Sequence, residues 1–471
     1  MSERKDVQNP IIEYAKQNGW EYIPPDDCLR MRQGEGGAIL RETFLKKMMD
    51  LNPDFMDGNL VNELIKRIEN ASPDIKGNLV VWEHLVGMRT VFVSDQNRDR
   101  NVKFIDFENV DRNVFQVTDE FTFTNGRYAT HPDRPDIVFF INGVPVFIVE
   151  TKDSSVLNAI IISMEQILRY HREIPELMTV LQSFQLTNII KFFYGPTMNV
   201  SEAYLINWRE EHAEQSASSH VEGFEILVKS FFDRERVLKI IKDYILFVEK
   251  DEVLSKVILM PHQMRAISKI LDRCASDKKR GLIWHTQGSG KTYTMIVAAR
   301  KILERPEFDR PTVIMMVDRN DLESQLFQNL SSVGFGNVRR AESREDLRKL
   351  LASDFRGLIV TLIQKFEEED KNLSDRSNIF VLIDEAHRST TGKFGNFMMA
   401  ALPNATYIGF TGTPVSRGSG QNTFHVFGRD DSSGYLDKYG IKESIEDGST
   451  IPLNYMIAEN KLLVDKDVLE K

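Results

Sequence analysis

The chain has 471 residues, of which 41% are hydrophobic and 28% are charged, and its formal net charge is −10. This composition supports a globular protein with two or three cores, but it disfavours a protein that coats nucleic acid nonspecifically, so any DNA contact must lie in a local basic groove. Because no apolar run approaches the roughly 20 residues of a membrane span and the polar start lacks the apolar core of a secretory signal, we expect a cytoplasmic protein without membrane contact.

The first 130 residues mix helical patterns with polar turns. An amphipathic helix that packs on a sheet is predicted by apolar residues at helical spacing: Leu60, Val61, Leu64, Ile65 and Ile68. Glu63 on the same helix could be a metal ligand, but a solvated helix face is the favoured interpretation.

Residues 136–152 contain two apolar runs on either side of Asn142 and Gly143, which is a strong signal for a β-hairpin with buried strands. A helix is predicted from Ala159 to Tyr170. Residues 210–220 are predicted to form a loop, and residues 232–249 a helix.

From Met260 onward, short apolar runs alternate with helical segments. This alternation predicts a parallel sheet in an α/β domain. The predicted strands are residues 281–284, 312–317, 358–363, 379–383 and 407–410.

The segment from His285 to Thr292 reads HTQGSGKT and lies between a predicted strand and a predicted helix, as a phosphate-binding loop does. Lys291 would reach the β- and γ-phosphates of ATP, and the Thr292 hydroxyl would bind Mg²⁺. His285 occupies a position where the general pattern has glycine. The candidate phosphate-binding residues are Gln287, Gly288, Ser289, Gly290, Lys291 and Thr292.

A second motif, which is acidic, is Asp384-Glu385-Ala386-His387. It directly follows a predicted strand, so its side chains should lie at the carboxyl edge of the sheet. We expect Asp384 to hold Mg²⁺, Glu385 to orient or deprotonate the attacking water, and His387 to belong to the same nucleotide site.

These two motifs resemble those of superfamily 2 helicases and translocases. The resemblance continues through Thr411, Gly412 and Thr413, which look like the motif that links ATP hydrolysis to DNA contact. Three shorter segments also resemble motifs of this family, but each could equally be a turn or a helix cap. They assign adenine contact to Gln263 and DNA contact to Arg319 and Gln364.

The hairpin supplies a second chemistry, because carboxylates beside a lysine can hold Mg²⁺ and activate water for phosphodiester hydrolysis. Asp136, Glu150 and Lys152 resemble the P-D…(D/E)-x-K nuclease motif. Gln166 and Tyr170, one helical turn apart, resemble the Q-x-x-x-Y element of the RecB-like nucleases within that family.

One geometric requirement accompanies this motif. A regular two-residue turn at Asn142 and Gly143 would put Asp136 opposite Val149, on the other face from Glu150. The nuclease interpretation therefore predicts an irregularity between residues 142 and 147, for which Pro145 is a suitable place.

A nuclease motif about 140 residues before a superfamily 2 motor resembles the restriction subunit of prokaryotic type I restriction-modification enzymes. The predicted fold class is α/β: an endonuclease domain over 1–250 and a first RecA-like ATPase domain over 251–455. The resemblance implies ATP and Mg²⁺ as cofactors, translocation and cleavage of double-stranded DNA, and separate methyltransferase and specificity subunits as partners.

Only about 58 residues follow Thr413, so we expect 456–471 to begin an absent second motor domain, and the chain alone to hydrolyse ATP poorly. Two alternatives remain open. A stand-alone helicase–nuclease of DNA repair or another phage-defence system would carry the same motifs. A non-enzymatic, nucleotide-gated scaffold with a decayed nuclease would be unaffected by Lys152→Ala.

Overall fold

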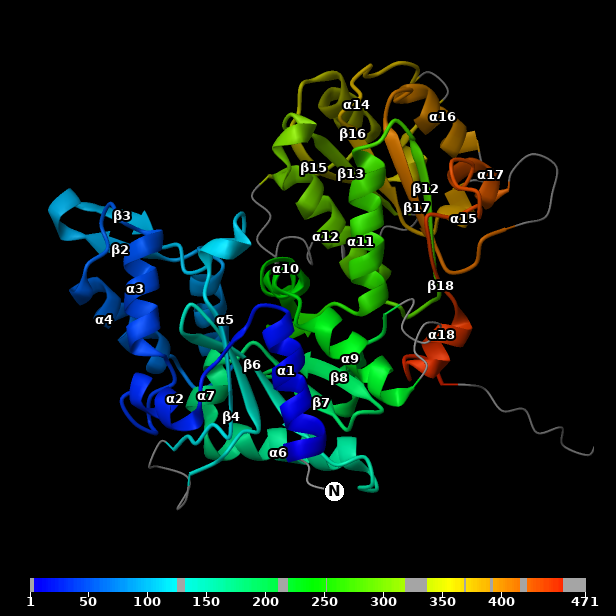
Figure 1. Cartoon of the computed structure of the whole chain (residues 1–471). Helices are drawn as coiled ribbons and strands as arrows, with labels where there is room; N and C mark the ends of the chain where they lie inside the picture. The colour runs from blue at the N-terminus through cyan, green and yellow to red at the C-terminus, as the bar shows by residue number, and fades with distance from the viewer. Residues whose placement is uncertain are drawn as a thin grey trace, which may run out of the picture.

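The computed structural model describes residues 4–124, 132–210, 219–250, 252–317, 337–367, 370–389, 393–415 and 422–451. Its strands form two seven-stranded sheets and two separate two-stranded hairpins. Figure 1 shows the N-terminal sheet in the lower part of the molecule and the helices and strands from α11 (Pro261–Cys274) to α17 (Thr423–Phe427) in the upper part, while α18 (Ile441–Glu446) lies lower, beside the N-terminal half. The predicted α/β fold class is confirmed.

The N-terminal sheet has the order β1-β4-β5-β6-β7-β8-β9 and is mixed, with parallel pairs at β1–β4 and β6–β7. Its two central strands, β5 and β6, are buried along their whole length, because their runs of branched and aromatic side chains have apolar layers on both faces. The strands are β1 Glu21–Tyr22, β4 Phe115–Asp119, β5 Ile137–Ile141, β6 Val144–Thr151, β7 Ser183–Thr187, β8 Phe192–Pro196 and β9 Ile206–Asn207.

The β5–β6 hairpin turns at Asn142 and Gly143, whose φ angles of 51° and 84° are both left-handed. This is the geometry of a tight turn that matches the twist of the two strands. Next to the turn, Phe140 pairs with Pro145, but Phe139 pairs with Phe147. The predicted irregularity between residues 142 and 147 is confirmed.

The extra residue in β6 changes which side chains share a face. Ile137 pairs with Val149, so the next position along the ladder brings Asp136 opposite Glu150. Without this bulge every side chain beyond it would be on the opposite face.

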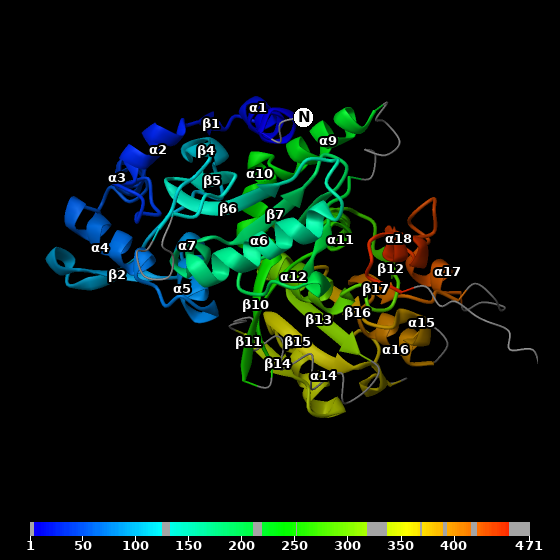
Figure 2. The same ribbon diagram turned by 90° about the horizontal axis from the view of Figure 1, so that it is seen from below.

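Helices surround the N-terminal sheet, and Figure 2 shows α6 running alongside β6 and β7. The predicted helices around residues 60–68 and 159–170 are confirmed as α4 and α6. Asp57 caps α4 by accepting a hydrogen bond from the backbone N–H of Leu60. The helices are η1 Arg4–Gln8, α1 Asn9–Gln17, α2 Pro25–Met31, α3 Arg41–Leu51, α4 Gly58–Glu69, α5 Ile75–Leu85, α6 Ala159–Glu173, α7 Pro175–Val180, α9 His220–Phe231 and α10 Arg234–Lys239.

The helix predicted over 232–249 is wrong in its last part. After α10 and a π-helical turn, η5 (Ile240–Tyr244), the chain becomes strand β10 (Ile245–Lys250) and pairs with β11 (Val253–Ile258). The run from Ile245 to Val248 has high β-propensity, and the antiparallel partner supplies the hydrogen bonds that a helix would otherwise provide. Most of the predicted loop at 210–220 lies outside the described residues.

The second sheet is fully parallel, with the order β14-β15-β13-β16-β17-β12-β18. All five strands predicted after Met260 are confirmed. The strands are β12 Arg280–His285, β13 Thr312–Val317, β14 Val338–Arg340, β15 Gly357–Leu362, β16 Ile379–Ile383, β17 Thr406–Thr411 and β18 Asp437–Tyr439. The helices are α11 Pro261–Cys274, α12 Lys291–Glu304, α14 Arg344–Ala352, α15 Ala386–Ser389, α16 Lys393–Ala401, α17 Thr423–Phe427 and α18 Ile441–Glu446.

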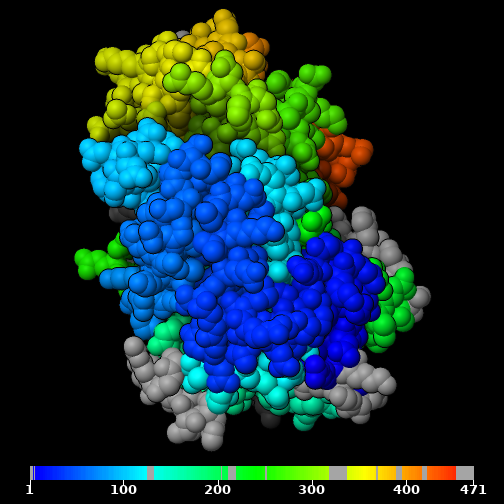
Figure 3. Space-filling model, turned by 60° about the vertical axis from the view of Figure 1, so that its left-hand side comes forward, coloured from blue at the N-terminus to red at the C-terminus, as the bar shows by residue number. Residues whose placement is uncertain are grey.

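The two halves are packed together. One continuous cluster of buried side chains includes residues of both sheets and of α11 and α12. Asp243 of η5 accepts a hydrogen bond from Lys301 of α12 at 3.0 Å. Figure 3 shows the N-terminal residues (blue) forming one broad face, with the second half (green to yellow) above them. Among the described residues, no helix is long and apolar enough to span a membrane.

Candidate functional site

The open end of the β5–β6 hairpin gathers the predicted nuclease residues. The backbone N–H of Asp136 points to Glu150 Oε1 at 3.4 Å, and Lys152 Nζ lies 4.0 Å from Glu150 Oε2. Thr151 donates to Asp136 Oδ2 from both its backbone N–H and its hydroxyl, each at 2.8 Å. The bulge in β6 therefore brings both carboxylates and the lysine together.

Helix α6 adds the predicted glutamine and tyrosine to this cluster. The buried Tyr170 hydroxyl donates to Glu150 Oε1 at 2.8 Å. With its amide oxygen turned toward Arg169, Gln166 places this oxygen 2.5 Å from the Arg169 guanidinium and 3.0 Å from the Tyr170 hydroxyl. The i, i+4 spacing thus places Gln166 beside Tyr170, whose hydroxyl contacts Glu150.

Glu150 is an acid in an unfavourable environment for its charge. It is 2% exposed. Burial raises its pKa well above the ordinary value, the nearby Asp136 carboxylate raises it further, and the Lys152 ammonium lowers it in part. Two carboxylates that share a buried site need a compensating cation or a proton.

The donor set fits Mg²⁺, which binds oxygen ligands and usually keeps several waters with only one or two protein carboxylates. Asp136 and Glu150 are such a pair. Within the described parts of the chain, no group of three or more His, Cys, Asp or Glu side chains could hold a metal ion. The remaining ligands would therefore be water, backbone or substrate oxygens.

Several residues at this centre carried no signal in the sequence. The Gln8 amide, from the start of the chain, donates to the Thr151 hydroxyl at 3.4 Å. Arg169 pairs with Asp133 at 3.0 Å and with Glu173 at 3.6 Å. Glu63 instead pairs with Arg67 on the solvent face of α4, in agreement with the solvated interpretation.

The phosphate-binding loop connects β12 to α12. Gly290 has a φ of 74° and precedes the first helical residue, Lys291. Gly288 has a φ of 78° and has no neighbour within 4 Å of a virtual Cβ, so its backbone is open to a ligand. Gln287 is also exposed, Ser289 is buried, and Thr292 is half-buried in the first turn of α12.

Lys291 rests on the loop itself, with its Nζ 3.4 Å from the carbonyl oxygen of His285 and 3.3 Å from that of Thr286. These are long contacts to neutral groups, so a phosphate would be a stronger partner for the ammonium. The loop backbone and this lysine therefore fit a nucleotide.

Gln263 joins α11 to the loop. Its amide oxygen accepts from the backbone N–H of Met260 at 2.7 Å, and its amide nitrogen donates to the carbonyl of Gly290 at 2.8 Å. A Cβ at Gly290 would lie 2.5 Å from that nitrogen, so only glycine allows this approach. The predicted adenine-contacting side chain is thus engaged with the phosphate-binding loop.

The acidic motif lies at the carboxyl edge of the sheet, as expected. Burial raises the pKa of Asp384, the Glu385 charge adds to this, and the Lys291 ammonium opposes it. Glu385 has a left-handed φ of 46°, which is costly for a residue with a Cβ and is often found at functional sites. His387 Nδ1 lies 2.8 Å from the Thr411 hydroxyl and 3.4 Å from Glu385 Oε2.

The turn after β17 touches the phosphate-binding loop. The backbone N–H of Thr413 donates to the Thr411 hydroxyl at 3.1 Å. A Cβ at Gly412 would lie 3.0 Å from the backbone nitrogen of Gln287, so the two turns are in close contact. Gln364 lies in the short helix η7 (Ile363–Lys365) after β15. Arg319 lies outside the described residues.

His285, the departure from the general loop pattern, is completely buried and bonds through Nε2 to Asp437 Oδ2 at 2.8 Å. Asp437 also accepts from Arg265 and Lys269 of α11, each at 2.8 Å. Its pKa is lowered, because hydrogen bonds from His285 and Arg265 outweigh the effect of burial. Sequence alone gave no reason to connect residues 152 positions apart.

Two family models match the chain. The N-terminal model of the type I restriction enzyme R protein matches residues 1–201, and the SWI2/SNF2 ATPase model matches residues 262–471. An ATPase family and a restriction nuclease family together imply the use of a nucleotide and of a divalent metal ion.

The curated relatives carry a consistent name. The HindI type I restriction enzyme endonuclease subunit of Haemophilus influenzae is 30% identical over 99% of this chain and 47% of its own length. The SsaAORF53P endonuclease subunit of Staphylococcus saprophyticus is 27% identical over 94% of this chain and 46% of its own. The chain spans about half the length of the curated relatives it matches.

Among solved structures, a Sulfolobus solfataricus SWI2/SNF2 ATPase core in complex with double-stranded DNA matches 33% of this chain and 32% of that chain, with 18% identity and a TM-score of 0.27. A likeness of this size transfers neither residues nor ligands. The two family models, matched in this order along one chain, and the shared name of the relatives show that the chain belongs to the family of type I restriction enzyme endonuclease subunits.

Proposed function

We propose that this chain provides the nuclease and the first motor domain of an ATP-dependent type I restriction endonuclease, which translocates double-stranded DNA and cleaves it when it is unmodified. The observation that carries the proposal is the bulged hairpin, which brings Asp136 and Glu150 together beside Lys152 and Tyr170. The proposed domains are 1–250 for the nuclease, 251–455 for the motor and 456–471 for the start of a second motor domain.

In the nuclease, Asp136 and Glu150 would hold Mg²⁺. When bound, Mg²⁺ supplies a Lewis acid that activates water and neutralises charge on the phosphate. The Thr151 and Tyr170 hydrogen bonds hold the two carboxylates in place, and Gln166 lies beside the Tyr170 hydroxyl. Lys152 Nζ lies 4.0 Å from the Glu150 carboxylate, so it is positioned to stabilise the negative charge that develops at phosphorus.

In the motor, Lys291 would exchange the two loop carbonyls for the β- and γ-phosphates of ATP, while Thr292 and Asp384 would hold Mg²⁺. The roles proposed for the remaining residues follow the sequence motifs: water activation by Glu385, adenine contact by Gln263, nucleotide binding by His387, and DNA contact or coupling by Arg319, Gln364 and Thr411–Thr413. The Gln263 amide has two hydrogens and two oxygen lone pairs, so its two present bonds leave capacity for adenine contact.

The proposed setting is the prokaryotic cytoplasm, in a complex with methyltransferase and specificity subunits that recognise the DNA sequence. The names of the relatives support this setting. A stand-alone helicase–nuclease is distinguished by DNA cleavage in the absence of these subunits.

The test compares Lys152→Ala and Lys291→Ala in the full-length protein, assembled with its neighbouring subunits, on unmodified plasmid DNA. We expect Lys152→Ala to abolish cleavage but retain DNA-stimulated ATP hydrolysis, and Lys291→Ala to abolish both. The matched control is Lys349→Ala, which removes a lysine paired with Glu345 on the surface of α14. Cleavage at the wild-type rate in Lys152→Ala would refute the nuclease assignment.

A further inference from the structure

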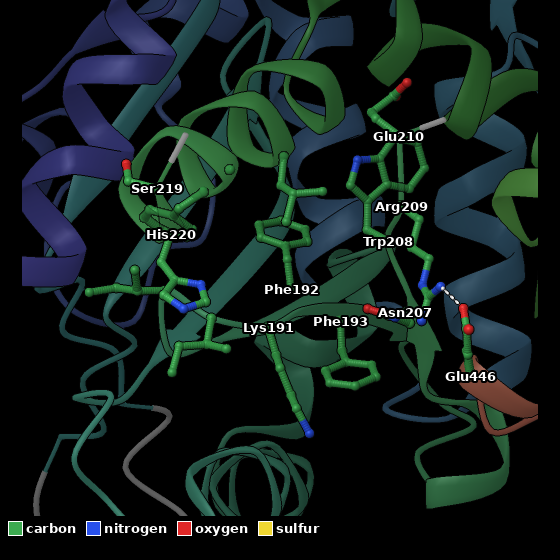
Figure 4. Close-up of a pocket in the computed structure, with 15 residues that line it drawn as sticks. Lys191, Phe192, Phe193, Asn207, Trp208, Arg209, Glu210, Ser219, His220 and Glu446 are labelled. Carbon is green, nitrogen blue, oxygen red and sulfur yellow. Dashed lines mark hydrogen bonds and ion pairs between the residues drawn. The ribbon is translucent and has the colours of Figure 1, made fainter. Parts of the chain in front are cut away.

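Helix α18 bridges the edges of the two sheets. It follows β18, the edge strand of the second sheet, and its end contacts the residues after β9, the edge strand of the first. Arg209 pairs with Glu446 at 3.0 Å and with Asp447 at 2.8 Å. Figure 4 shows the Arg209–Glu446 pair beside a cavity of about 720 Å³ that α9 and strand β8 also line.

Asp447 interacts with both halves of the molecule. The Tyr439 hydroxyl donates to Asp447 Oδ2 at 2.9 Å. Burial raises the pKa of this carboxyl, and the nearby Arg209 and Asn207 side chains oppose the rise. The Asp447 side chain is only 17% exposed, so these contacts are partly shielded from water and from salt. A change in Arg209 or Asn207 therefore acts directly on the carboxylate that holds Tyr439.

Tyr439 in turn contacts the phosphate-binding loop in two ways. Its backbone carbonyl accepts from the backbone N–H of Thr286 at 2.9 Å. Its ring stacks on the His262 imidazole, with 3.6 Å between centroids and 9° between planes. His262 Nε2 lies 2.9 Å from the carbonyl oxygen of Ser289.

These contacts fix the direction of the last hydrogen bond. A carbonyl only accepts, so His262 Nε2 must carry the hydrogen and donate to Ser289. Burial, reinforced by the neighbouring His285, lowers the pKa of His262 to about 3, so the ring is neutral and adopts this one tautomer. The position of the Ser289 carbonyl is thus tied to the ring of Tyr439.

We propose that His262, Tyr439 and Asp447 are positioning residues of the nucleotide site, through which Asn207 and Arg209 of the N-terminal half influence the phosphate-binding loop. The inference rests on the proposed function, because it requires that this loop bind a nucleotide. Phosphate binding reorients the backbone groups around Ser289, and His262 and Tyr439 convey that change to Asp447.

Such coupling must act in both directions. If nucleotide binding changes the contacts of Asp447 with Asn207 and Arg209, then loss of those contacts must change nucleotide affinity by the same factor. A purely structural interface between the halves would not change nucleotide affinity. The two acids at the end of α18 distinguish a relay from such an interface. Glu446 pairs with Arg209, whereas of these two acids only Asp447 is bonded to Tyr439.

The experiment measures the affinity of the whole chain for a fluorescent ATP analogue with Mg²⁺. The variants are Arg209→Ala, Asp447→Asn and Tyr439→Phe, with Glu446→Gln as the matched control and Lys291→Ala as the control for specific binding. We expect about 3- to 10-fold changes in Kd for the first three, the scale typical of residues that modulate coupling without touching a ligand. Glu446→Gln should stay within twofold of wild type. Tyr439→Phe keeps the stacked ring, so the fold is retained.

A second measurement tests the effect of nucleotide binding on the N-terminal half. Amide hydrogen exchange at Ile206, Asn207 and Trp208 should change when nucleotide binds to wild type, and this response should be lost in Tyr439→Phe. The double variant Arg209→Ala/Tyr439→Phe should bind no more weakly than the weaker single variant, because both substitutions interrupt one connection.

Equal nucleotide affinity in wild type, Arg209→Ala and Tyr439→Phe would overturn the relay and leave the proposed function intact. The relay would also be refuted if Glu446→Gln changed Kd as much as Asp447→Asn. If wild type and Lys291→Ala bound the analogue equally weakly, the proposed nucleotide site itself would fail, and the relay with it.

Discussion

The nuclease centre and the nucleotide site of this chain are constructed differently. In the nuclease centre, charged side chains already contact one another, and the central acid Glu150 is buried and hydrogen-bonded. In the nucleotide site, the ligand-facing part is exposed backbone at Gln287 and Gly288, and the Lys291 ammonium rests on neutral carbonyls.

The difference follows from what each site must bind. A divalent cation needs preassembled oxygens, and their mutual repulsion is a cost that burial increases. Phosphates can be held by backbone N–H groups and a helix N-terminus, which carry no net charge and can stay exposed at little cost. The nuclease centre should therefore respond sharply to single side-chain changes, and the nucleotide site to changes in backbone packing.

The largest effect is expected for Glu150→Gln. Removal of one of the two carboxylates should lower the rate of DNA cleavage by about 10³-fold, the upper scale for loss of one preorganised electrostatic group. ATP hydrolysis should be retained. The measurement is plasmid cleavage and ATPase activity of the same assembled preparation, and loss of both activities together would contradict a separate nuclease centre.

The same variant has a predicted pH signature without metal. The folded-state pKa of Glu150 is raised, so the folded protein binds a proton more tightly than the unfolded chain does. Wild-type stability should therefore fall as the pH rises from the ordinary carboxyl range toward the raised pKa. Glu150→Gln should lose this part of the decline. Thermal unfolding of both proteins from pH 4 to 8, about the range between ordinary and strongly raised carboxyl pKa values, makes the comparison.

A smaller effect is expected for Tyr170→Phe. This change removes only the hydroxyl that donates to Glu150 at 2.8 Å. A hydrogen bond to a charged group contributes about 1.5–3 kcal/mol, so cleavage should slow by about 10-fold or more. Tyr204→Phe, which removes a half-exposed hydroxyl elsewhere in the same half, is the control. Equal rates for the two variants would mean that the Tyr170 hydroxyl does not position Glu150.

Most of the fold was predictable because strong local patterns agreed with the tertiary structure. The five strands of the second sheet are apolar runs that are buried on both faces, and the nuclease hairpin has an Asn-Gly turn between two such runs. The bulge was predictable only because the two acids would otherwise lie on opposite faces. Its location between residues 142 and 147 was also predicted, and the structure places it between Pro145 and Phe147.

What sequence could not supply are the contacts made by residues far apart. Residues 245–249 continue a helical pattern, but they have high β-propensity and form a strand because β11 pairs with them. The bond from His285 to Asp437 and the stack of Tyr439 on His262 depend on the position of β18 at the sheet edge. No local pattern encodes such neighbours, so these supporting contacts of the phosphate-binding loop were missed.

Gly412→Ala tests the nucleotide site through packing. The added Cβ would lie 3.0 Å from the Gln287 nitrogen and 3.2 Å from the His285 carbonyl oxygen, so the phosphate-binding loop must shift. Overpacking of this kind typically costs about 1–3 kcal/mol, and we expect nucleotide affinity to fall about 5-fold or more. Binding of Mn²⁺ to the nuclease centre should be unchanged in the same protein. Gly58→Ala, at a position with no neighbour within 4 Å, is the control.

The smallest effect is expected for Gln8→Leu, which tests how far the preassembly of the nuclease centre extends. Gln8 is 3% exposed, its amide nitrogen donates to the Thr151 hydroxyl at 3.4 Å, and within the described residues its amide oxygen has no hydrogen-bond partner. Leucine removes a long bond behind Asp136, so cleavage should slow by only about 3-fold, which is the scale of a weak hydrogen bond. It also removes an unsatisfied buried oxygen, so the metal-free melting temperature should stay the same or rise. A fall in both melting temperature and cleavage would instead assign Gln8 a structural role, whereas slower cleavage at equal or greater stability would extend the preassembled centre to the first helix of the chain.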